Sequence, residues 1–264
     1  MNNVYIIATP IGNLDDITIR ALNVLKNIKF IFCEDTRHSK ILFEKYSIKN
    51  RELYSLNKFN ESSKELLILK KLKQGDVAII SDAGTPTISD PGQFILKKLK
   101  EKNINLIPIP GPNSIISALS ASGEIYKSFS FLGFLPKTKE KIKSAIFENM
   151  QTDLNIFFES SNRIKKTLQI LKDEFGDFPI ILAKEITKKF ENIKKDKPSN
   201  FLNELNLKGE FVLIINNKEI NKDQQINYLI SKYKNKFTTN NDLINYFVLK
   251  YNLNKTQLYN IFKK

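Results

Sequence analysis

Apolar runs alternate with longer amphipathic stretches along most of this chain, and turn-forming residues separate them. Short apolar runs between turns are typical of buried strands, whereas apolar residues three and four apart are typical of helices that cover a sheet. Leu66, Leu69 and Leu72 show helical spacing. The runs that predict strands in the first half are residues 4–8, 30–33, 52–55, 76–80 and 105–109. This alternation predicts a mostly parallel, doubly wound α/β domain over residues 1–122.

The second half repeats the alternation. Strands are expected at residues 129–134, 154–158, 180–183 and 211–215, with a helix over 163–175. We therefore expect a second α/β domain over residues 123–218. The two domains would meet around residues 120–127, and a cleft between domains is a common place for a ligand.

After Asn217 the composition shifts to lysine, asparagine and tyrosine. Three short amphipathic helices are expected at residues 223–235, 241–251 and 255–262, within a tail over 219–264. Thr239 or Asn240, and then Asn254, are suitable N-caps for the last two. Two short helices joined by a tight turn resemble a helix-turn-helix, and the alternative is a small helical bundle with no binding role.

Composition narrows the function classes. At 264 residues and 41% hydrophobic content, the chain can bury one large core or two ordinary ones. The net charge of +14 favours a polyanionic partner such as a nucleic acid, although abundant lysine supplies some surface charge by default. We expect no membrane span and no signal peptide, hence a cytoplasmic protein. Cys33 and His38 are the only residues of their kinds, so neither a disulfide nor a metal site is expected.

Four polar or turn-forming clusters follow predicted strands, and they are residues 9–13, 33–37, 81–92 and 110–114. In a parallel sheet all four would lie at one edge, which is where open α/β sheets bind ligands. Gly84 and Gly92 allow positive φ, while Pro86 and Pro91 fix φ, so the third loop is built for a rigid shape. The alternative is a set of ordinary connections.

The fourth cluster leads into an apolar helix at residues 115–119, whose first N–H groups could bind a carboxylate. No lysine accompanies it as in a nucleotide P-loop. The loop therefore suits a nucleoside with a small charged tail better than a triphosphate.

Charged residues at three strand ends suggest catalysis and RNA contact, namely the cluster at residues 33–37 and two clusters in the second half. A carboxylate of Glu34 or Asp35 could act as a base or position a hydroxyl, and Arg37 could hold a phosphate, with His38 beside it. The alternative is an internal salt bridge with a helix-cap carboxylate. In the second half, residues 159–163 and 184–189 could follow an RNA backbone, or be ordinary charged helix starts.

Seven segments, taken in order, resemble the bacterial ribosomal RNA small subunit methyltransferase I family over about residues 1–216. They are Ala8-Thr-Pro-Ile-Gly-Asn-Leu14 with Asp16-Ile-Thr18 and Arg20-Ala21, Cys33-Glu-Asp-Thr-Arg-His38, residues 81–92, Pro110-Gly-Pro112, Gly133-Phe-Leu-Pro136, Glu159-Ser160 with Arg163, and Lys184-Glu185 with Thr187-Lys188. The resemblance implies the tetrapyrrole methylase fold with S-adenosylmethionine bound between the two domains. It also implies 2′-O-methylation of a cytidine ribose in the decoding region of 16S rRNA, on the small ribosomal subunit, by a homodimer.

By motif position, the resemblance implies roles for particular residues. Those expected at the methyl donor are Pro10, Ile11, Gly12, Asp82, Ala83, Gly84, Thr85, Pro86, Ile88, Gly111, Asn113, Ser114, Glu159 and Ala183. Those expected at the RNA are Arg37, His38, Arg163, Lys184 and Lys188. Catalytic roles fall to Glu34, Asp35, Arg37 and Glu185, and the three carboxylates remain alternatives for a base.

Two departures from the family pattern bear on that choice. The chain reads Asn57-Lys-Phe-Asn-Glu61 where relatives tend to carry histidines, and Asn162 replaces a frequent histidine beside Arg163. Positioning alone can supply about 7–11 kcal/mol of barrier reduction, so a strong base is not mandatory.

Two other functions are alternatives to rRNA methylation. They are a tetrapyrrole C-methyltransferase and a non-catalytic RNA-binding or ribosome-assembly module.

Overall fold

The computed structural model describes residues 2–204 and 206–262, which form two compact units. Unit 1 runs to Ser117 and takes in the segment Ile186–Lys189, while unit 2 holds Ala118–Glu185 and the chain from Phe190 onward. The tail helices group with unit 2. The division of the chain into three domains at residues 122 and 218 stays a prediction. None of the helices in the described part of the chain is long and apolar enough to span a membrane.

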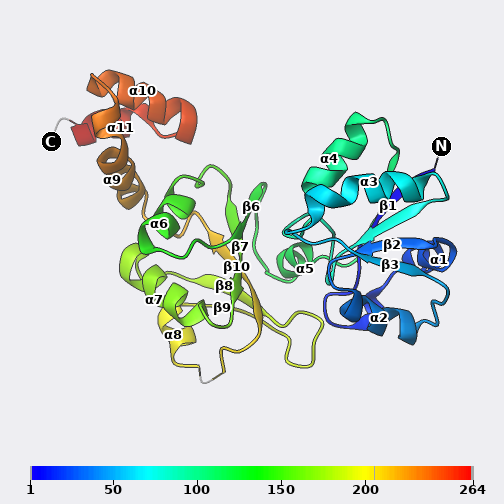
Figure 1. Cartoon of the computed structure of the whole chain (residues 1–264). Coiled ribbons are helices and arrows are strands. Elements are labelled where there is room, and N and C mark those ends of the chain that lie inside the picture. The colour runs from blue at the N-terminus through cyan, green and yellow to red at the C-terminus, as the bar shows by residue number, and fades with distance from the viewer. Residues whose placement is uncertain (1, 205, 263–264) are drawn as a thin grey trace. The chain divides into compact units, whose positions relative to one another are not determined.

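Unit 1 is built on a five-stranded sheet in the order β3-β2-β4-β1-β5 (Figure 1). The strands are β1 (Val4–Ile7), β2 (Phe30–Cys33), β3 (Glu52–Ser55), β4 (Val77–Ile80) and β5 (Leu106–Ile109). All neighbouring pairs are parallel, which confirms the predicted doubly wound domain. Pro108 lies in β5, an edge strand, where a residue without an N–H group is tolerated.

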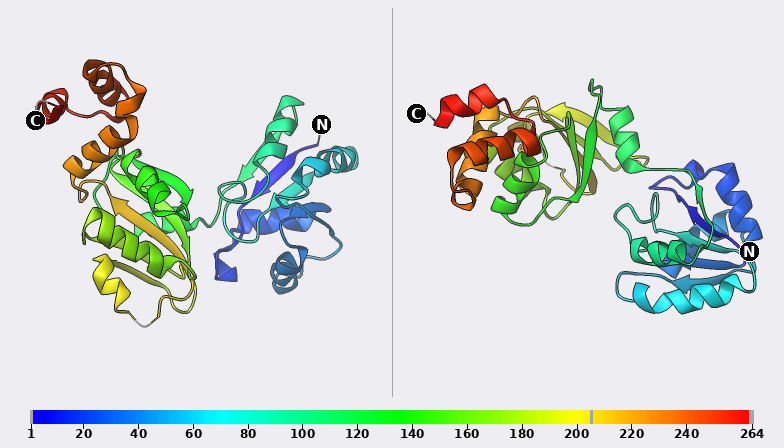
Figure 2. Two further views of the ribbon diagram at one scale, coloured as in Figure 1. Left: turned by 60° about the vertical axis from the view of Figure 1, so that its left-hand side comes forward. Right: turned by 90° about the horizontal axis from the view of Figure 1, so that it is seen from above.

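Helices cover both faces of this sheet. They are the 3₁₀ turn η1 (Leu14–Asp16), α1 (Ile19–Asn27), α2 (Thr36–Lys45), α3 (Glu61–Leu72) and α4 (Gln93–Glu101). Helix α5 (Ser114–Ser120) follows β5 and crosses the end of unit 1 at Ser117. One core joins α1 and α2 to the sheet through Leu25 and Phe43, and another joins α3 and α4 to it through Ile68 and Ile95. Figures 1 and 2 show α3 and α4 side by side.

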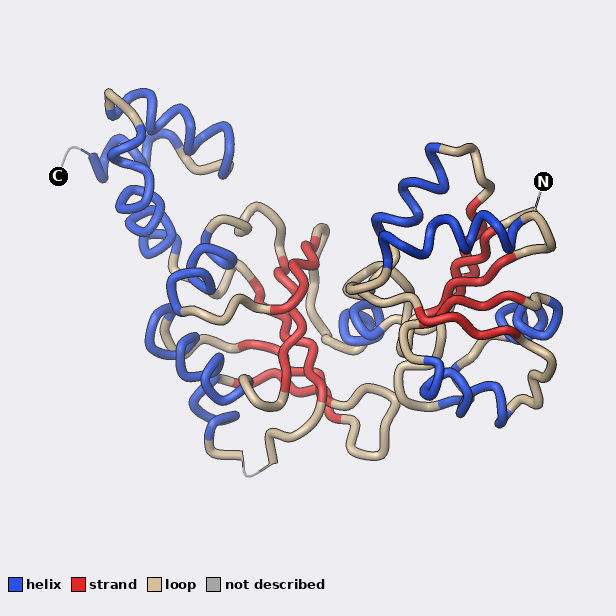
Figure 3. Tube along the Cα trace, viewed as in Figure 1, coloured by secondary structure: helices blue, strands red, loops and turns tan. Residues whose placement is uncertain are grey.

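Unit 2 contains a mixed sheet in the order β6-β7-β10-β8-β9. Its strands are β6 (Phe129–Phe134), β7 (Leu154–Ser160), β8 (Ile180–Lys184), β9 (Asn192–Asp196) and β10 (Glu210–Asn216). Only the β6–β7 pair is parallel. Helices α6 (Lys139–Phe147), α7 (Ile164–Phe175) and α8 (Pro198–Leu202) share one core with the sheet and lie against one of its faces (Figure 3).

Three elements of unit 2 lie outside those predicted, namely α6, β9 and α8. Strand β9 carries Lys194 and Lys195 and forms the edge of the sheet, where charge protects a strand from pairing with other chains. It therefore lacks the apolar run of a central strand. Helix α6 does carry a helical signal, since Ile142 and Ile146 are four residues apart and both are buried.

The tail consists of α9 (Lys222–Tyr233), the 3₁₀ turn η2 (Lys234–Lys236), α10 (Asn240–Tyr251) and α11 (Lys255–Phe262). The three predicted helices are confirmed, and Thr239 caps α10 by accepting a hydrogen bond from the N–H of Asp242. Helix α9 is tied to α6, because buried Gln225 donates to the carbonyl of Phe147 over 2.8 Å and Lys232 pairs with Glu148. The tail is therefore an integral part of unit 2.

Candidate functional site

The ends of four strands of the first sheet are aligned by register. Ile7 at the end of β1 pairs with Ile80 of β4 and Ile109 of β5, and Ile80 also pairs with Cys33 of β2. The loops that follow these strands therefore begin at one edge of the sheet, as the sequence predicts. The sequence expectation missed the loop after β3, which begins at the same edge because Cys33 pairs with Ser55.

The loop after β4 is fixed to the end of β1 by a short antiparallel bridge. Thr9 and Gly84 exchange two backbone hydrogen bonds of 2.9 Å, and the Thr9 hydroxyl donates to the carbonyl of Ser81. Gly84 has a φ of +78°, and a Cβ there would lie 3.3 Å from Cγ2 of Ile11. The residues predicted at the donor in these two loops, Pro10–Gly12 and Asp82–Pro86, are thus brought together, with the half-exposed Ile88 in the same loop.

The loop after β5 joins the same group. A Cβ on Gly111 would lie 3.1 Å from the Cβ of Ala8, so the backbones beyond β5 and β1 approach closely. The Asn113 amide donates to the Thr85 hydroxyl over 3.3 Å. Three of the four expected loops therefore form one connected surface made largely of small residues.

The first N–H groups of α5 are bonded within the chain, whereas the sequence predicts that they are open to a ligand. The side-chain oxygen of Asn113 accepts hydrogen bonds from the N–H groups of Ile115 and Ile116, at 3.0 and 3.2 Å. The prediction that the first N–H groups of this helix bind a ligand carboxylate is wrong for these two groups, because the asparagine oxygen occupies that place. A donor-binding role for Asn113 and Ser114 themselves stays a prediction.

Asp35 and Arg37 form an internal salt bridge, which is the alternative to a functional role for residues 33–37 that the sequence leaves open. The Asp35 carboxylate caps α2 by accepting from the N–H of Arg37, and it also takes a bidentate hydrogen bond from the guanidinium, with Nη2 at 2.6 Å from Oδ2. These hydrogen bonds lower the pKa of Asp35 to about 2. The Arg37 side chain is 88% exposed. Its role at the RNA, like that of exposed His38 in the same helical turn, stays a prediction.

Glu34 has a different environment from Asp35. Its carboxylate accepts no hydrogen bond from the residues that the structure describes. Burial raises its pKa, the negative charges of Asp90 and Asp82 raise it further, and the charge of Lys58 opposes them. The pKa of Asp90 is also raised, mainly by burial.

Across residues 2–204 and 206–262, no three His, Cys, Asp or Glu side chains are placed to hold a metal ion.

The third alternative for a base, Glu185, is engaged elsewhere. It follows β8 with a φ of +51°, and its carboxylate accepts from the N–H of Glu210 over 2.9 Å. A Cβ on Gly209 would lie 2.6 Å from Cγ of Glu185, so the side chain packs directly against that glycine. Asp35 and Glu185 thus both accept hydrogen bonds from neighbouring residues. Glu34 has a raised pKa and accepts none from the residues that the structure describes.

The predicted residues of β7 and β8 lie in unit 2. Glu159 is 2% exposed and bonds to the Thr167 hydroxyl at 2.7 Å, and its ion-pair partner Arg163 donates to the carbonyls of Leu135 and Pro136. Ala183 is buried in β8, and the ammonium of Lys184 donates to the carbonyl of Asn206. These contacts give Glu159, Arg163 and Lys184 local structural roles. Their predicted roles at the donor or the RNA stay predictions.

The segment Ile186–Lys189 meets the loop after β1 within unit 1. The N–H of Asn13 donates to the Thr187 hydroxyl over 3.0 Å, and a Cβ on Gly12 would lie only 2.5 Å from Cγ of Lys188. Gly12, predicted at the donor, and Lys188, predicted at the RNA, are therefore in contact. Only glycine allows this approach.

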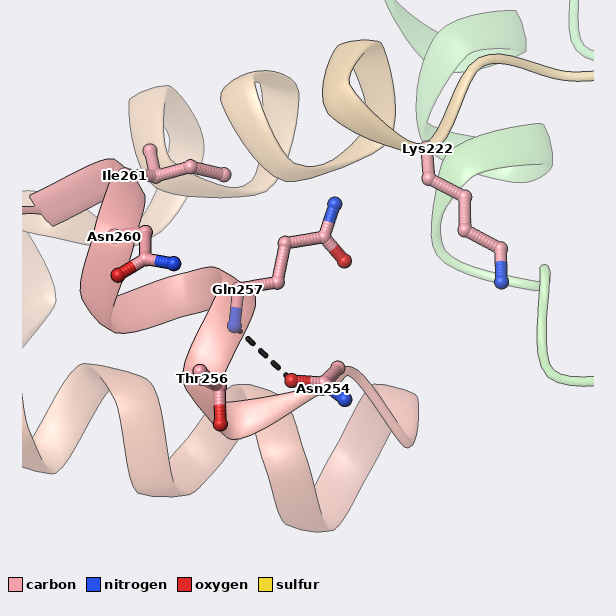
Figure 4. Close-up of a pocket in the computed structure, with 6 residues that line it drawn as sticks. All are labelled: Lys222, Asn254, Thr256, Gln257, Asn260 and Ile261. Atoms are coloured by element: carbon pink, nitrogen blue, oxygen red, sulfur yellow. Dashed lines mark hydrogen bonds between the residues drawn. The ribbon is translucent and has the colours of Figure 1, made fainter.

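The tail has a hollow of its own. A space of 610 Å³ lies between the start of α9 and helix α11, and Asn254 caps α11 by accepting from the N–H of Gln257 (Figure 4). The helices α10 and α11 are joined by a short turn in which Asn252 takes a left-handed conformation. This arrangement is compatible with a helix-turn-helix. RNA binding by the tail stays a prediction.

Comparisons with known proteins identify the family. Residues 3–200 match the model of the Tetrapyrrole (Corrin/Porphyrin) Methylases. A protein from Buchnera aphidicola called ribosomal RNA small subunit methyltransferase I is 42% identical over 231 residues, which cover 83% of this chain and 80% of that protein. The protein of the same name from Mycoplasmopsis pulmonis is 44% identical over 218 residues, covering 81% and 97%.

A solved structure gives the same fold. The uroporphyrin-III-C-methyltransferase of Thermus thermophilus superposes with a TM-score of 0.57 at 19% identity, over 82% of this chain and 95% of that one. That identity supports the fold alone. The sequence relatives go further, and they show that this chain belongs to the tetrapyrrole methylase family and, within it, to the ribosomal RNA small subunit methyltransferase I group.

Proposed function

We propose that this protein transfers a methyl group from S-adenosylmethionine to the ribose 2′-oxygen of a cytidine in the decoding region of 16S rRNA. Membership of the group supports the coarser activity, methylation of small-subunit rRNA. The observation that supports a hydroxyl acceptor is the carboxylate of Glu34, which stands at the sheet edge with a raised pKa and without a hydrogen-bond donor among the described residues. The protein acts on the small ribosomal subunit in the cytoplasm as a homodimer.

The residues at the sheet edge fit an adenosyl donor. Gly111 is exposed just beyond the end of β5, and the apolar side chains of Ile11 and Ile88 are only partly buried. Purine rings are bound in this way, by apolar contacts and by backbone groups that lie open to the ligand. S-adenosylmethionine supplies an electrophilic methyl group when bound. Pro10–Gly12, Asp82–Pro86, Ile88, Gly111, Asn113 and Ser114 are proposed to hold it, together with Glu159 and Ala183 of unit 2.

Glu34 is the proposed base. A ribose hydroxyl is a weak nucleophile, and the carboxylate of Glu34 would accept its proton when the methyl group passes from the donor sulfur, which leaves as a thioether, to the ribose oxygen. A raised pKa makes Glu34 a stronger base than Asp35, whose pKa of about 2 is held down by its hydrogen bonds to Arg37. Arg37, 88% exposed, is proposed to hold a phosphate next to the reacting ribose through the edge of its guanidinium that Asp35 does not use.

The test uses small ribosomal subunits from a strain that lacks the corresponding gene. The purified full chain is incubated with radiolabelled S-adenosylmethionine and these subunits, and the modified nucleoside is identified by mass spectrometry. We expect 2′-O-methylcytidine at one position of the decoding region. A methyl group on a base, or on a porphyrin precursor supplied in parallel, would contradict the proposal. Light scattering of the same sample tests the homodimer.

A further inference from the structure

The turn after β3 is held rigid and presents an aromatic side chain to solvent. Asn57 and Asn60 bond reciprocally, since the N–H of Asn57 donates to Oδ1 of Asn60 over 2.9 Å and the N–H of Asn60 donates to Oδ1 of Asn57 over 3.1 Å. The Asn60 amide also donates to the carbonyl of Ser55. Lys58 and Phe59 lie between the two asparagines, and Phe59 is fully exposed.

A second exposed aromatic side chain lies at the start of α4. Phe94 is 48% exposed, and the ammonium of Lys98 lies 4.6 Å from the centre of its ring. Helices α3 and α4 are tied together here, because the Glu61 carboxylate accepts from the N–H of Ile95 over 3.0 Å. The first turn of α4 and the turn after β3 are thereby held as one surface.

An open hollow of 570 Å³ lies on this surface. Its lining consists of Lys58, Glu61, Asp90, Pro91, Gly92, Gln93, Phe94 and Lys97. Its size is within the range of ordinary ligand pockets. It combines one aromatic ring and two lysines with two carboxylates. Fully exposed Phe59 follows the lining residue Lys58 in the chain.

Hydrogen bonds connect the turn that carries Lys58 to the backbone of Glu34. The Asn60 amide donates to the carbonyl of Ser55 over 3.2 Å, and the Ser55 hydroxyl donates to the carbonyl of Glu34 over 3.5 Å. Asp90 belongs to the loop after β4 that also contains Asp82 and Gly84, and the charges of Asp90 and Lys58 both act on Glu34. An RNA strand with its reacting ribose at Glu34 would therefore run beside two segments that line the hollow, the turn after β3 and the loop after β4.

We propose that the hollow binds a nucleotide of the rRNA strand adjacent to the methylated ribose. Single-stranded RNA is recognised by stacking of splayed bases on aromatic side chains and by cations along the backbone, and Phe94 and Phe59 with Lys58 and Lys97 supply both. Asp90 at the wall is an acceptor for the amino group of a base. The inference rests on the proposed function and assigns it a substrate subsite.

The experiment compares paired variants of the full chain. In the double variant Phe59→Ala/Phe94→Ala, affinity for a decoding-region RNA fragment should fall by about tenfold or more, because stacking is lost. The KM for small subunits should rise, while kcat at saturating RNA and donor affinity stay close to wild type. In Lys58→Gln/Lys97→Gln, the slope of log affinity against log salt should decrease by about 0.7 for each lysine that contacts phosphate.

Matched controls come from α3, which follows the same turn. Leu66→Ala removes an apolar side chain that is 78% exposed, and Lys70→Gln removes an exposed charge; neither residue lines the hollow. Both should bind RNA like wild type. Calorimetry with S-adenosylmethionine verifies in each variant that the donor loops are intact.

Two results would overturn the subsite. One is wild-type RNA affinity in the double phenylalanine variant. The other is conversion of a dimer to a monomer by that variant in light scattering, which would make the aromatic pair an interface between copies of this chain. Because affinity is measured without turnover, these results are separable from failure of the proposed function, which would appear as absence of methyl incorporation by the wild-type protein.

Discussion

Gly84 combines a left-handed backbone conformation with close packing against the loop after β1. Its φ of +78° disfavours any side chain, and a Cβ would lie 3.3 Å from Ile11. We predict that Gly84→Ala weakens binding of S-adenosylmethionine by on the order of tenfold, since one added methyl group at a close-fitting site has this effect. Isothermal calorimetry measures it. Gly123→Ala is the control, because Gly123 has a similar φ of +70° but nothing within 4 Å of its Cβ.

Both substitutions should destabilise the fold by about 1–2 kcal/mol through left-handed backbone strain. Only Gly84→Ala should affect the donor. Equal donor affinity in the two variants would remove Gly84 from the binding surface.

The raised pKa of Glu34 makes stability depend on pH and, through its proposed role as the base, turnover as well. Its pKa is raised, so the folded state holds a proton more tightly than the unfolded chain, and stability falls as pH rises from about the ordinary glutamate value through the raised one. We predict that Glu34→Gln raises the melting temperature at neutral pH and that this gain disappears below about pH 4. The same variant should lose turnover by on the order of a hundredfold.

The measurements are thermal unfolding across pH and single-turnover methylation at saturating RNA and donor. Wild-type turnover should itself fall as pH drops through the raised pKa. A Glu34→Gln protein with wild-type turnover would show that proximity alone drives the reaction.

At the scale of elements, a buried amide contributes to the attachment of the tail. Gln225 of α9 is 2% exposed and donates to the carbonyl of Phe147 in α6. We predict that Gln225→Ala lowers the free energy of unfolding by about 1–3 kcal/mol, because it leaves that buried carbonyl unpaired. Chemical denaturation measures the change. Gln224→Ala, one residue earlier and exposed, should have almost no effect, and equal losses in the two variants would contradict the assignment.

At the scale of the whole molecule, the net charge of +14 should govern RNA association. We predict that affinity for 16S rRNA falls at least about tenfold between about 50 and about 200 mM salt, since bound lysines and arginines release counterions from the phosphates. Donor affinity should be nearly constant over the same range. Filter binding and calorimetry give the two values, and an RNA affinity that is insensitive to salt would argue that the charge is unrelated to the substrate.

The sequence by itself determined the strands of the first domain and the shared edge at which the loops after them begin. Strands β2, β3 and β6 match their predicted bounds, because each is a short apolar or β-prone run between turn residues. The order of the motifs also identified the family. The loops after β1, β2, β4 and β5 could be predicted to converge, since parallel strands with short loops leave their carboxyl ends together.

Only the tertiary structure decided what each polar side chain does. Sequence left Glu34, Asp35 and Glu185 equivalent, and they differ because Asp35 is bonded to Arg37, Glu185 to the N–H of Glu210, and Glu34 is partly buried beside Asp90. Asn113 caps α5, and Lys58 and Phe94 line one hollow although 36 positions separate them in the sequence. Hydrogen-bond partners and burial arise from contacts between segments far apart in the chain, which no local pattern of residues encodes.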